Sequence, residues 1–124
     1  MPVIRAAEAE VHQMHNARFT SYARPGTGSA ELCVWRLDID PESQGQPHRV
    51  LREEVFVLLE GEVVLTIDGV ANSLGAGDAA IAPAGAVIRV DNPGAGRAGV
   101  LVTVPVGFWG ELPDGTRIAP RWVS

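Results

Sequence analysis

The chain has 124 residues, of which 46% are hydrophobic and 20% are charged, as is typical of one globular domain with a modest core. Its formal net charge is −5, its ten cationic side chains are all scattered arginines, and it has no lysine. A basic nucleic-acid-binding face and Schiff-base chemistry through lysine are therefore excluded. No apolar stretch approaches the roughly 20 residues that cross a bilayer, and the N-terminus lacks the pattern of a secretory signal. We expect a soluble, cytoplasmic protein with no nucleic-acid or membrane partner.

The first thirty residues have the least regular pattern in the chain. Residues 5–15 are the one stretch that could form a short helix, on which His12 and His15 would share a face. The regular strand pattern begins with ELCVWRLDI at 31–39. Asp40-Pro41 ends this strand, because proline cannot continue a paired strand.

Short apolar segments separated by turn residues follow. Strands are predicted at 54–61 and 62–69, joined around Gly61, and Asp68-Gly69 is a strong signal for a tight hairpin turn. Three further strands are predicted at 79–83, 86–90 and 99–106. Turns that recur about every eight to twelve residues are typical of all-β sandwiches and barrels.

We therefore predict a single all-β domain with three parts. These are an N-terminal arm with the first strands (1–30), a barrel core (31–106) and a C-terminal tail (107–124). Trp109 and Trp122 lie in the tail, where exposure to water would be costly. We expect the tail to pack on the barrel or on a partner subunit.

The segment QPHRVLREEVFVLLEGEVVL (46–65) combines ionisable side chains with a long apolar run. If residues 48–58 run extended, strand alternation places one set of side chains on the same face, namely His48, Val50, Arg52, Glu54, Phe56 and Leu58. The opposite face is also mostly apolar, so both faces would be covered and the ionisable groups would need partners or water. A pocket with these groups at its mouth would meet that need.

Two spaced motifs lie between residues 45 and 92. The first is read as His48-x-Val50, three residues, Glu54, six residues, Gly61, and the second as Gly77, five residues, Pro83-x-Gly85, two residues, Ile88, three residues, Asn92. In these spacings the chain resembles the cupins, a family of small conserved β-barrels, although Glu42 replaces a glycine before the first motif. The resemblance implies the cupin fold, a jelly-roll-like β-barrel or double-stranded β-helix. It also implies a homodimer with crossing N-terminal strands.

Cupins typically bind a metal ion through three histidines and a glutamate. Only His48 and Glu54 remain at those positions here, because Val50 and Ile88 replace the other two and have no lone pair to donate. Two protein ligands hold a divalent ion weakly, so we expect no metal and no other cofactor. A ligand set rebuilt with His12 or His15 from the N-terminal arm is the alternative.

The first functional hypothesis is a barrel that binds a small molecule. The alkyl side chains that replace the histidines would turn a metal site into apolar wall. The pocket predicted in this way is lined by Val50, Arg52, Phe56, Ile88 and Trp35, with His48 and Glu54 retained inside it. The arginine could bind a carboxylate or an enolate with two parallel hydrogen bonds.

Two other functions remain open, and the sequence does not decide whether the protein is an enzyme. Glu54 and His48 could be the catalytic acid and base of a metal-independent isomerase, lyase or cyclase acting on a small carbonyl compound, because burial and pairing shift pKa values. With a rebuilt ligand set, the chain could instead be a metal-dependent oxygenase or isomerase. A purely structural role is a further alternative, in which the two side chains hydrogen-bond each other and hold adjacent strands together.

Overall fold

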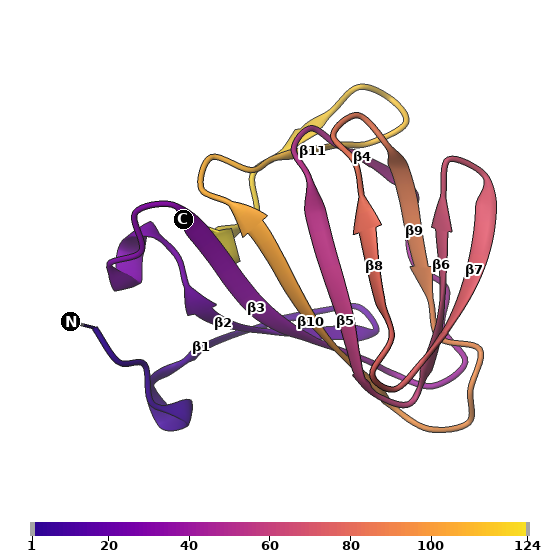
Figure 1. Cartoon of the computed structure of the whole chain (residues 1–124), viewed down its shortest axis with the longest axis horizontal. Helices are drawn as coiled ribbons and strands as arrows, with labels where there is room; N and C mark the ends of the chain where they lie inside the picture. The colour runs from indigo at the N-terminus through magenta and orange to yellow at the C-terminus, as the bar shows by residue number, and fades with distance from the viewer. Residues whose placement is uncertain (1, 124) are drawn as a thin grey trace.

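Turn residues at regular intervals divide the chain into short strands, which form two antiparallel sheets facing each other (Figure 1). The structure is a computed structural model and describes residues 2–123. The first sheet has the strand order β1 (Glu10–Met14), β2 (Ala17–Ala23), β3 (Leu32–Ile39), β10 (Ala98–Pro105), β5 (Glu54–Glu60) and β8 (Ala79–Ala82). The second sheet has the order β12 (Arg117–Ile118), β11 (Gly110–Glu111), β4 (His48–Val50), β9 (Val87–Asp91), β6 (Glu62–Ile67) and β7 (Val70–Gly75). The predicted all-β, cupin-like barrel is confirmed.

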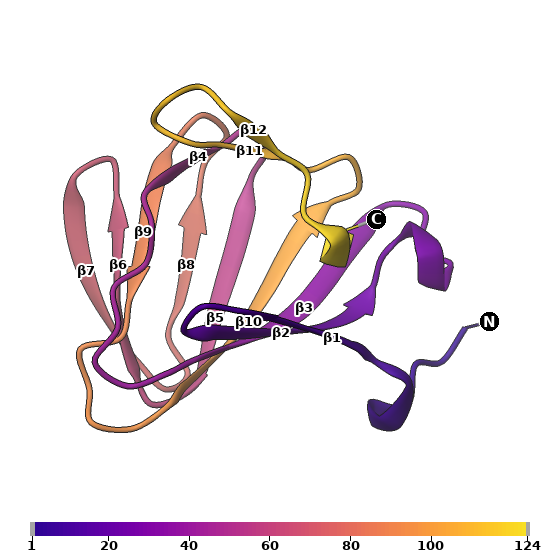
Figure 2. The same cartoon turned by 180° about the vertical axis from the view of Figure 1, so that it is seen from behind.

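The helical segments of the described chain are three short 3₁₀ turns. They are η1 (Ala6–Glu8), η2 (Pro25–Thr27) and η3 (Arg121–Val123). None of the described helices is long and apolar enough to cross a membrane. The last turn, η3, packs against β2 and β3, so the end of the chain closes back onto the first sheet (Figure 2).

Each predicted strand begins and ends within about two residues of its position in the structure. The turn at Asp68-Gly69 shows how local residues determine these positions. Asp68 and Gly69 both have positive φ angles, 48° and 81°, as a two-residue hairpin turn of this type requires. Ile67 and Val70 pair directly across that turn. Local turn chemistry therefore determines the position of the β6–β7 hairpin.

Two expectations about the chain path are wrong. Residues 5–15 form η1 and β1 rather than one helix, because β1 pairs with β2 in a hairpin that turns at His15 and Asn16. Residues 48–58 are not one strand either, because β4 belongs to the second sheet and β5 to the first. Residues 51–53 form a bend between them, so strand alternation does not carry across it.

A glycine marks the point where the chain passes from β5 in the first sheet to β6 in the second. Gly61 has a φ angle of 80°, and a Cβ atom there would lie 2.8 Å from the carbonyl oxygen of Arg97. Both the backbone conformation and the close approach require glycine. The last position of the first motif is thus explained by the fold.

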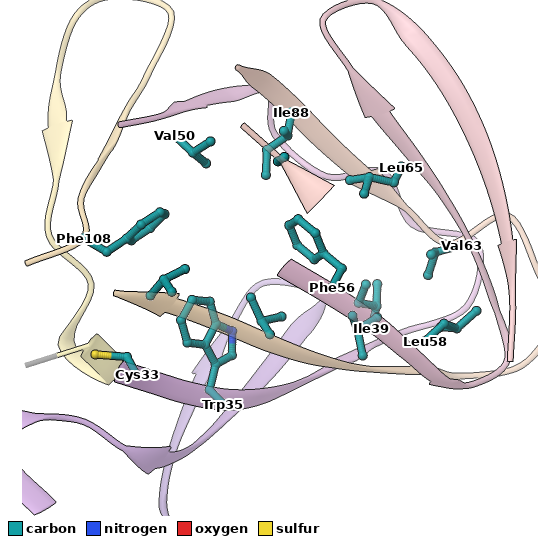
Figure 3. Close-up of a cluster of buried hydrophobic side chains, with 14 of the residues drawn as sticks. Cys33, Trp35, Ile39, Val50, Phe56, Leu58, Val63, Leu65, Ile88 and Phe108 are labelled. Carbon is teal, nitrogen blue, oxygen red and sulfur yellow. The ribbon is translucent and has the colours of Figure 1, made fainter. Parts of the chain in front are cut away.

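The core fills the space between the two sheets (Figure 3). Successive side chains of a strand point to opposite faces of the sheet. The even-numbered residues of β10 are therefore buried in the core, whereas Leu101 and Thr103 are only partly buried. The fully buried side chains with the largest volumes include Leu58, Leu65, Ile88 and Val50. At one side of this core the packing leaves a cavity.

Candidate functional site

A cavity of about 470 Å³, partly open to solvent, lies between the sheets. Most of its wall is apolar and aromatic and comes from both sheets and from the C-terminal segment. These residues include Phe19, Trp35, Leu37, Ile39, Phe56, Ile88, Val90, Val102, Phe108, Leu112, Ile118, Pro120 and Trp122. The volume falls within the range of roughly 300–1,000 Å³ that is typical of small-molecule sites.

Part of the polar lining comes from two segments at the surface. One is the turn of the β1–β2 hairpin, with His15 and Asn16, and the other is the loop that precedes β4, with Gln44 and Gln46. All four residues are exposed, so the entrance to the cavity lies between these segments. The loop is anchored by the backbone N–H of Gly45, which donates to Asp91 Oδ1 at 2.9 Å.

Among the described residues, Glu54 provides the one carboxyl group in the lining. It is the first residue of β5 and pairs with Ala82 of β8, a position that directs its side chain between the sheets. The residue is only 4% exposed, and its Oε1 atom has no hydrogen-bond partner among the described residues. Burial raises the pKa of Glu54 to about 8, so the group is mostly a neutral carboxylic acid at pH 7. Such a group can donate a hydrogen bond or exchange a proton near neutral pH.

His48 lines the same cavity but does not contact Glu54 through a polar atom. It lies on β4 opposite Ile88 of β9, is half-buried, and its Nδ1 atom is 3.0 Å from the carbonyl oxygen of Gln46. Within residues 2–123, no hydrogen bond or ion pair joins His48 to Glu54. The geometry therefore offers no support for the hypothesis that the two residues are kept only to hold adjacent strands together.

The other predicted pocket residues fall into two groups. Trp35, Phe56 and Ile88 line the cavity. Val50 is fully buried in the core and is not part of the lining, and Arg52 is exposed in the bend after β4. The bend at 51–53 explains the position of Arg52, because strand alternation does not carry across it.

No arginine of the described chain lines the cavity. Arg89, which follows Ile88 on β9, forms an ion pair with Asp91 at 2.9 Å and is not part of the lining. The ionisable residues of the lining are therefore His15, His48 and Glu54. An anionic ligand would find no guanidinium partner in this cavity.

Trp35 contributes a second polar group without a partner. Its indole is 4% exposed, and its Nε1 atom is buried with no hydrogen-bond acceptor among the described residues. In Figure 3 the ring rises from β3 into the space between the sheets, on the side where Phe56 and Ile88 lie. A buried N–H group without an acceptor is rare in native structures.

The sequence interpretation missed the part of the lining that comes from the two ends of the chain. Trp122 of η3 stacks on Phe19 of β2, with ring centroids 3.9 Å apart and an interplanar angle of 14°. Both rings line the cavity. The signal available in the sequence was an aromatic residue in a tail otherwise poor in regular structure.

The residues present do not fit the metal ion that the family typically holds. Of the four usual ligand positions, those occupied by Val50 and Ile88 offer alkyl groups. The described chain contains no group of three or more His, Cys, Asp or Glu side chains that could hold a metal. His12 does not complete the set, because its Nε2 atom lies 2.9 Å from Glu10 Oε1 and the residue is not part of the cavity lining.

Comparisons with known proteins bear on the fold. A family model described as a cupin domain matches residues 35–104, whereas no curated protein matches the sequence. The polyketide cyclase RemF from Streptomyces resistomycificus is 17% identical with a TM-score of 0.75, over 85% of this chain and 79% of that one. A predicted oxalate decarboxylase from Thermotoga maritima is 20% identical with a TM-score of 0.72, over 83% and 97%. An RmlC-like cupin from Shewanella frigidimarina is 18% identical with a TM-score of 0.69, over 82% and 86%.

Proposed function

The chain belongs to the cupin family, and from this premise we propose that its barrel binds a small, largely apolar organic molecule in the cavity that contains Glu54. The observation that carries the proposal is a cavity of about 470 Å³ with aromatic and aliphatic walls and one buried carboxyl group. Pockets of this kind bind ligands through apolar contact and orient them through a few polar groups. The homodimer and the cytoplasmic location remain predictions from the sequence.

The state of Glu54 supports a ligand-binding role over a structural one. A buried carboxyl group without a hydrogen-bond partner costs free energy, because water is lost and nothing replaces it. A residue that only supported the fold would be expected to have a partner. A ligand that enters the cavity can supply that partner.

Filling part of the cavity is expected to weaken the binding of an apolar probe. In Leu37→Trp, the larger ring would occupy space in the cavity wall, so the affinity for the neutral dye N-phenyl-1-naphthylamine should fall by more than about tenfold. The matched control is Leu59→Trp, because Leu59 is 42% exposed on the outer face of β5. Dye fluorescence in a titration measures both. Equal affinities for the two variants would show that the dye binds elsewhere.

Acid–base catalysis on a small carbonyl compound is the second candidate function, and the raised pKa of Glu54 favours it. A carboxyl group that titrates near pH 8 has an appreciable ionised fraction at neutral pH and is a stronger base than an ordinary glutamate. The ionised Glu54 would accept a proton from the carbon next to the carbonyl group. The proton on Glu54 would then exchange with solvent, and Glu54 would return a solvent proton to the same carbon, which restores the ketone and the carboxylate.

This second function predicts hydrogen–deuterium exchange at that carbon. The methyl protons of 2-acetylnaphthalene should exchange in D₂O faster with the protein than without it, and the rate should rise as the pH passes about 8, where the base form accumulates. Glu54→Gln should remove the acceleration, while Glu53→Gln, at an exposed neighbour, should retain it. NMR signal loss measures the rate. Exchange that is unchanged in Glu54→Gln would exclude Glu54 as the base.

A further inference from the structure

Two polar groups in the cavity wall have no partner within the described chain, and both are hydrogen-bond donors. The indole N–H of Trp35 can only donate. The carboxyl group of Glu54, with no cation beside it and only 4% of the residue exposed, is held in its neutral form and donates through its O–H. Two hydrogen-bond donors without partners in one wall favour a ligand that has hydrogen-bond acceptor atoms.

Sheet register places both donors on the same inner face. Trp35 of β3 lies opposite Val102 of β10, which lies opposite Phe56 of β5. Glu54 is two residues from Phe56 along β5, so its side chain projects to the same side. The two donors therefore flank an apolar floor formed by Val102 and Phe56, with β10 between them.

The rest of the wall indicates the body of the ligand. Flat aromatic rings of Phe19, Phe108 and Trp122 surround the remaining space. Aromatic rings pack well against other rings in offset or edge-on arrangements. The exposed polar groups are confined to the entrance, where His15 and Gln46 lie.

The charge pattern argues against an anionic ligand. A carboxylate placed beside Glu54 would raise the cost of ionising either group, and no arginine of residues 2–123 lines the cavity to offset it. Of the described basic side chains in the lining, His48 is the one that is half-buried, and its Nδ1 atom is already 3.0 Å from a backbone carbonyl oxygen. A neutral acceptor, such as a ketone or quinone oxygen, avoids this cost.

We infer that the ligand of this cavity is an uncharged, ring-containing molecule with at least one carbonyl oxygen that accepts hydrogen bonds from Glu54 and Trp35, an inference that rests on the proposed function. The carbonyl oxygen satisfies donors that otherwise have no partner. The ring system occupies the aromatic part of the wall. Selectivity over a hydrocarbon of the same shape then comes from the two donors.

Three ligands of similar shape test the inference by competition with N-phenyl-1-naphthylamine at pH 6. 2-Acetylnaphthalene carries the carbonyl oxygen, 2-isopropenylnaphthalene replaces that oxygen by a CH₂ group, and 2-naphthoate carries a negative charge. We expect the ketone to bind about five- to tenfold more tightly than the hydrocarbon, as one or two neutral hydrogen bonds would provide. The naphthoate should bind more weakly than both.

Variants identify the donors. Glu54→Leu and Trp35→Phe should each bring the ratio of ketone to hydrocarbon affinity closer to one. The hydrocarbon affinity in the same variant shows that the cavity is intact. Glu53→Leu, at an exposed neighbour, should leave the ratio unchanged. In the unmodified protein the ratio should fall above pH 8, where Glu54 ionises and ceases to donate.

The outcomes separate this inference from the proposed function. If the ketone and the hydrocarbon bind equally well, the cavity binds apolar ligands as proposed, but the inference about the carbonyl group is wrong. If the naphthoate binds most tightly, the inference is also wrong. If none of the three binds, the proposed function fails together with it.

Discussion

Replacing Glu54 by glutamine is expected to stabilise the folded protein at pH 7 by about 3 kcal/mol. The pKa of this carboxyl group is raised from about 4.5 to about 8 in the folded state, so folding at pH 7 requires the uptake of a proton. Each pH unit above 4.5 costs about 1.4 kcal/mol up to the folded pKa. The contribution of Glu54 to stability is therefore fully present below pH 4.5 and is lost as the pH rises to about 8. Glutamine has a similar shape and does not ionise.

Urea unfolding at several pH values measures this effect. The difference in the free energy of unfolding between Glu54→Gln and the unmodified protein should be small near pH 4.5 and grow steadily up to pH 8. Glu53→Gln is the matched control, because Glu53 is exposed and its substitution should change stability by less than about 0.5 kcal/mol. A loss of stability in Glu54→Gln at pH 7 would contradict the prediction, since it would mean that an ionised Glu54 has a stabilising partner.

Substituting Asn92 by alanine is expected to destabilise the fold by about 3–5 kcal/mol. Asn92 is 1% exposed, and its Nδ2 group donates to the carbonyl oxygens of Ile39, Asp40 and Gly96 at 2.9–3.1 Å. Its Oδ1 atom accepts from the backbone N–H of Gly94 at 3.0 Å. Alanine would leave these backbone groups without partners, several of them away from water. The cost should therefore be far larger than that of a surface asparagine.

Asn72→Ala provides the comparison for Asn92→Ala. Asn72 lies exposed on β7, and its Nδ2 group also donates to backbone carbonyl oxygens, those of Leu65 and Val70. Because water can replace these bonds, the cost there should stay near 1 kcal/mol or below. Thermal and urea unfolding measure both variants. Equal costs would show that Asn92 does not hold the loops around it.

Asn92 also connects the fold to the cavity. Its backbone pairs with Ser43 in the loop before β4, and Ser43 and the residues after it line the cavity entrance. Asn92→Ala keeps these backbone bonds but removes the side-chain hydrogen bonds to the carbonyl oxygens of Ile39 and Asp40, where the same loop begins. Apolar-probe binding is therefore expected to weaken even under conditions in which the variant remains folded.

Most of the fold could be predicted from the sequence because its turns are specified locally. Asp68-Gly69 requires positive φ angles that place a hairpin, and Gly61 occupies a crossing between sheets where a side chain would collide with the backbone. Gly61 and Asn92 also occupy positions of the two cupin motifs. The backbone conformation at such residues can be predicted from the local sequence, so they indicate where the chain turns.

The site could be predicted only in part, because its geometry depends on contacts between distant segments. Arg52 was assigned to the pocket from strand alternation, which fails at a bend caused by the change of sheet after Val50. Trp122 and Phe19 are separated by most of the chain, and no local pattern indicates that they stack on each other. The same limit applies to Glu54, since the sequence allowed either an ion pair with His48 or an isolated neutral acid.

A pH titration of the Glu54 carboxyl carbon by ¹³C NMR tests most directly whether a neutral carboxylic acid lies in the cavity between the sheets. The resonance is identified by its absence from the spectrum of Glu54→Gln. We predict a titration midpoint near pH 8. The chemical shift of the resonance should stay constant from pH 4 to pH 6, where the carboxyl group remains neutral. A midpoint below pH 5 would contradict this, because Glu54 would then be an ordinary ionised carboxylate at neutral pH.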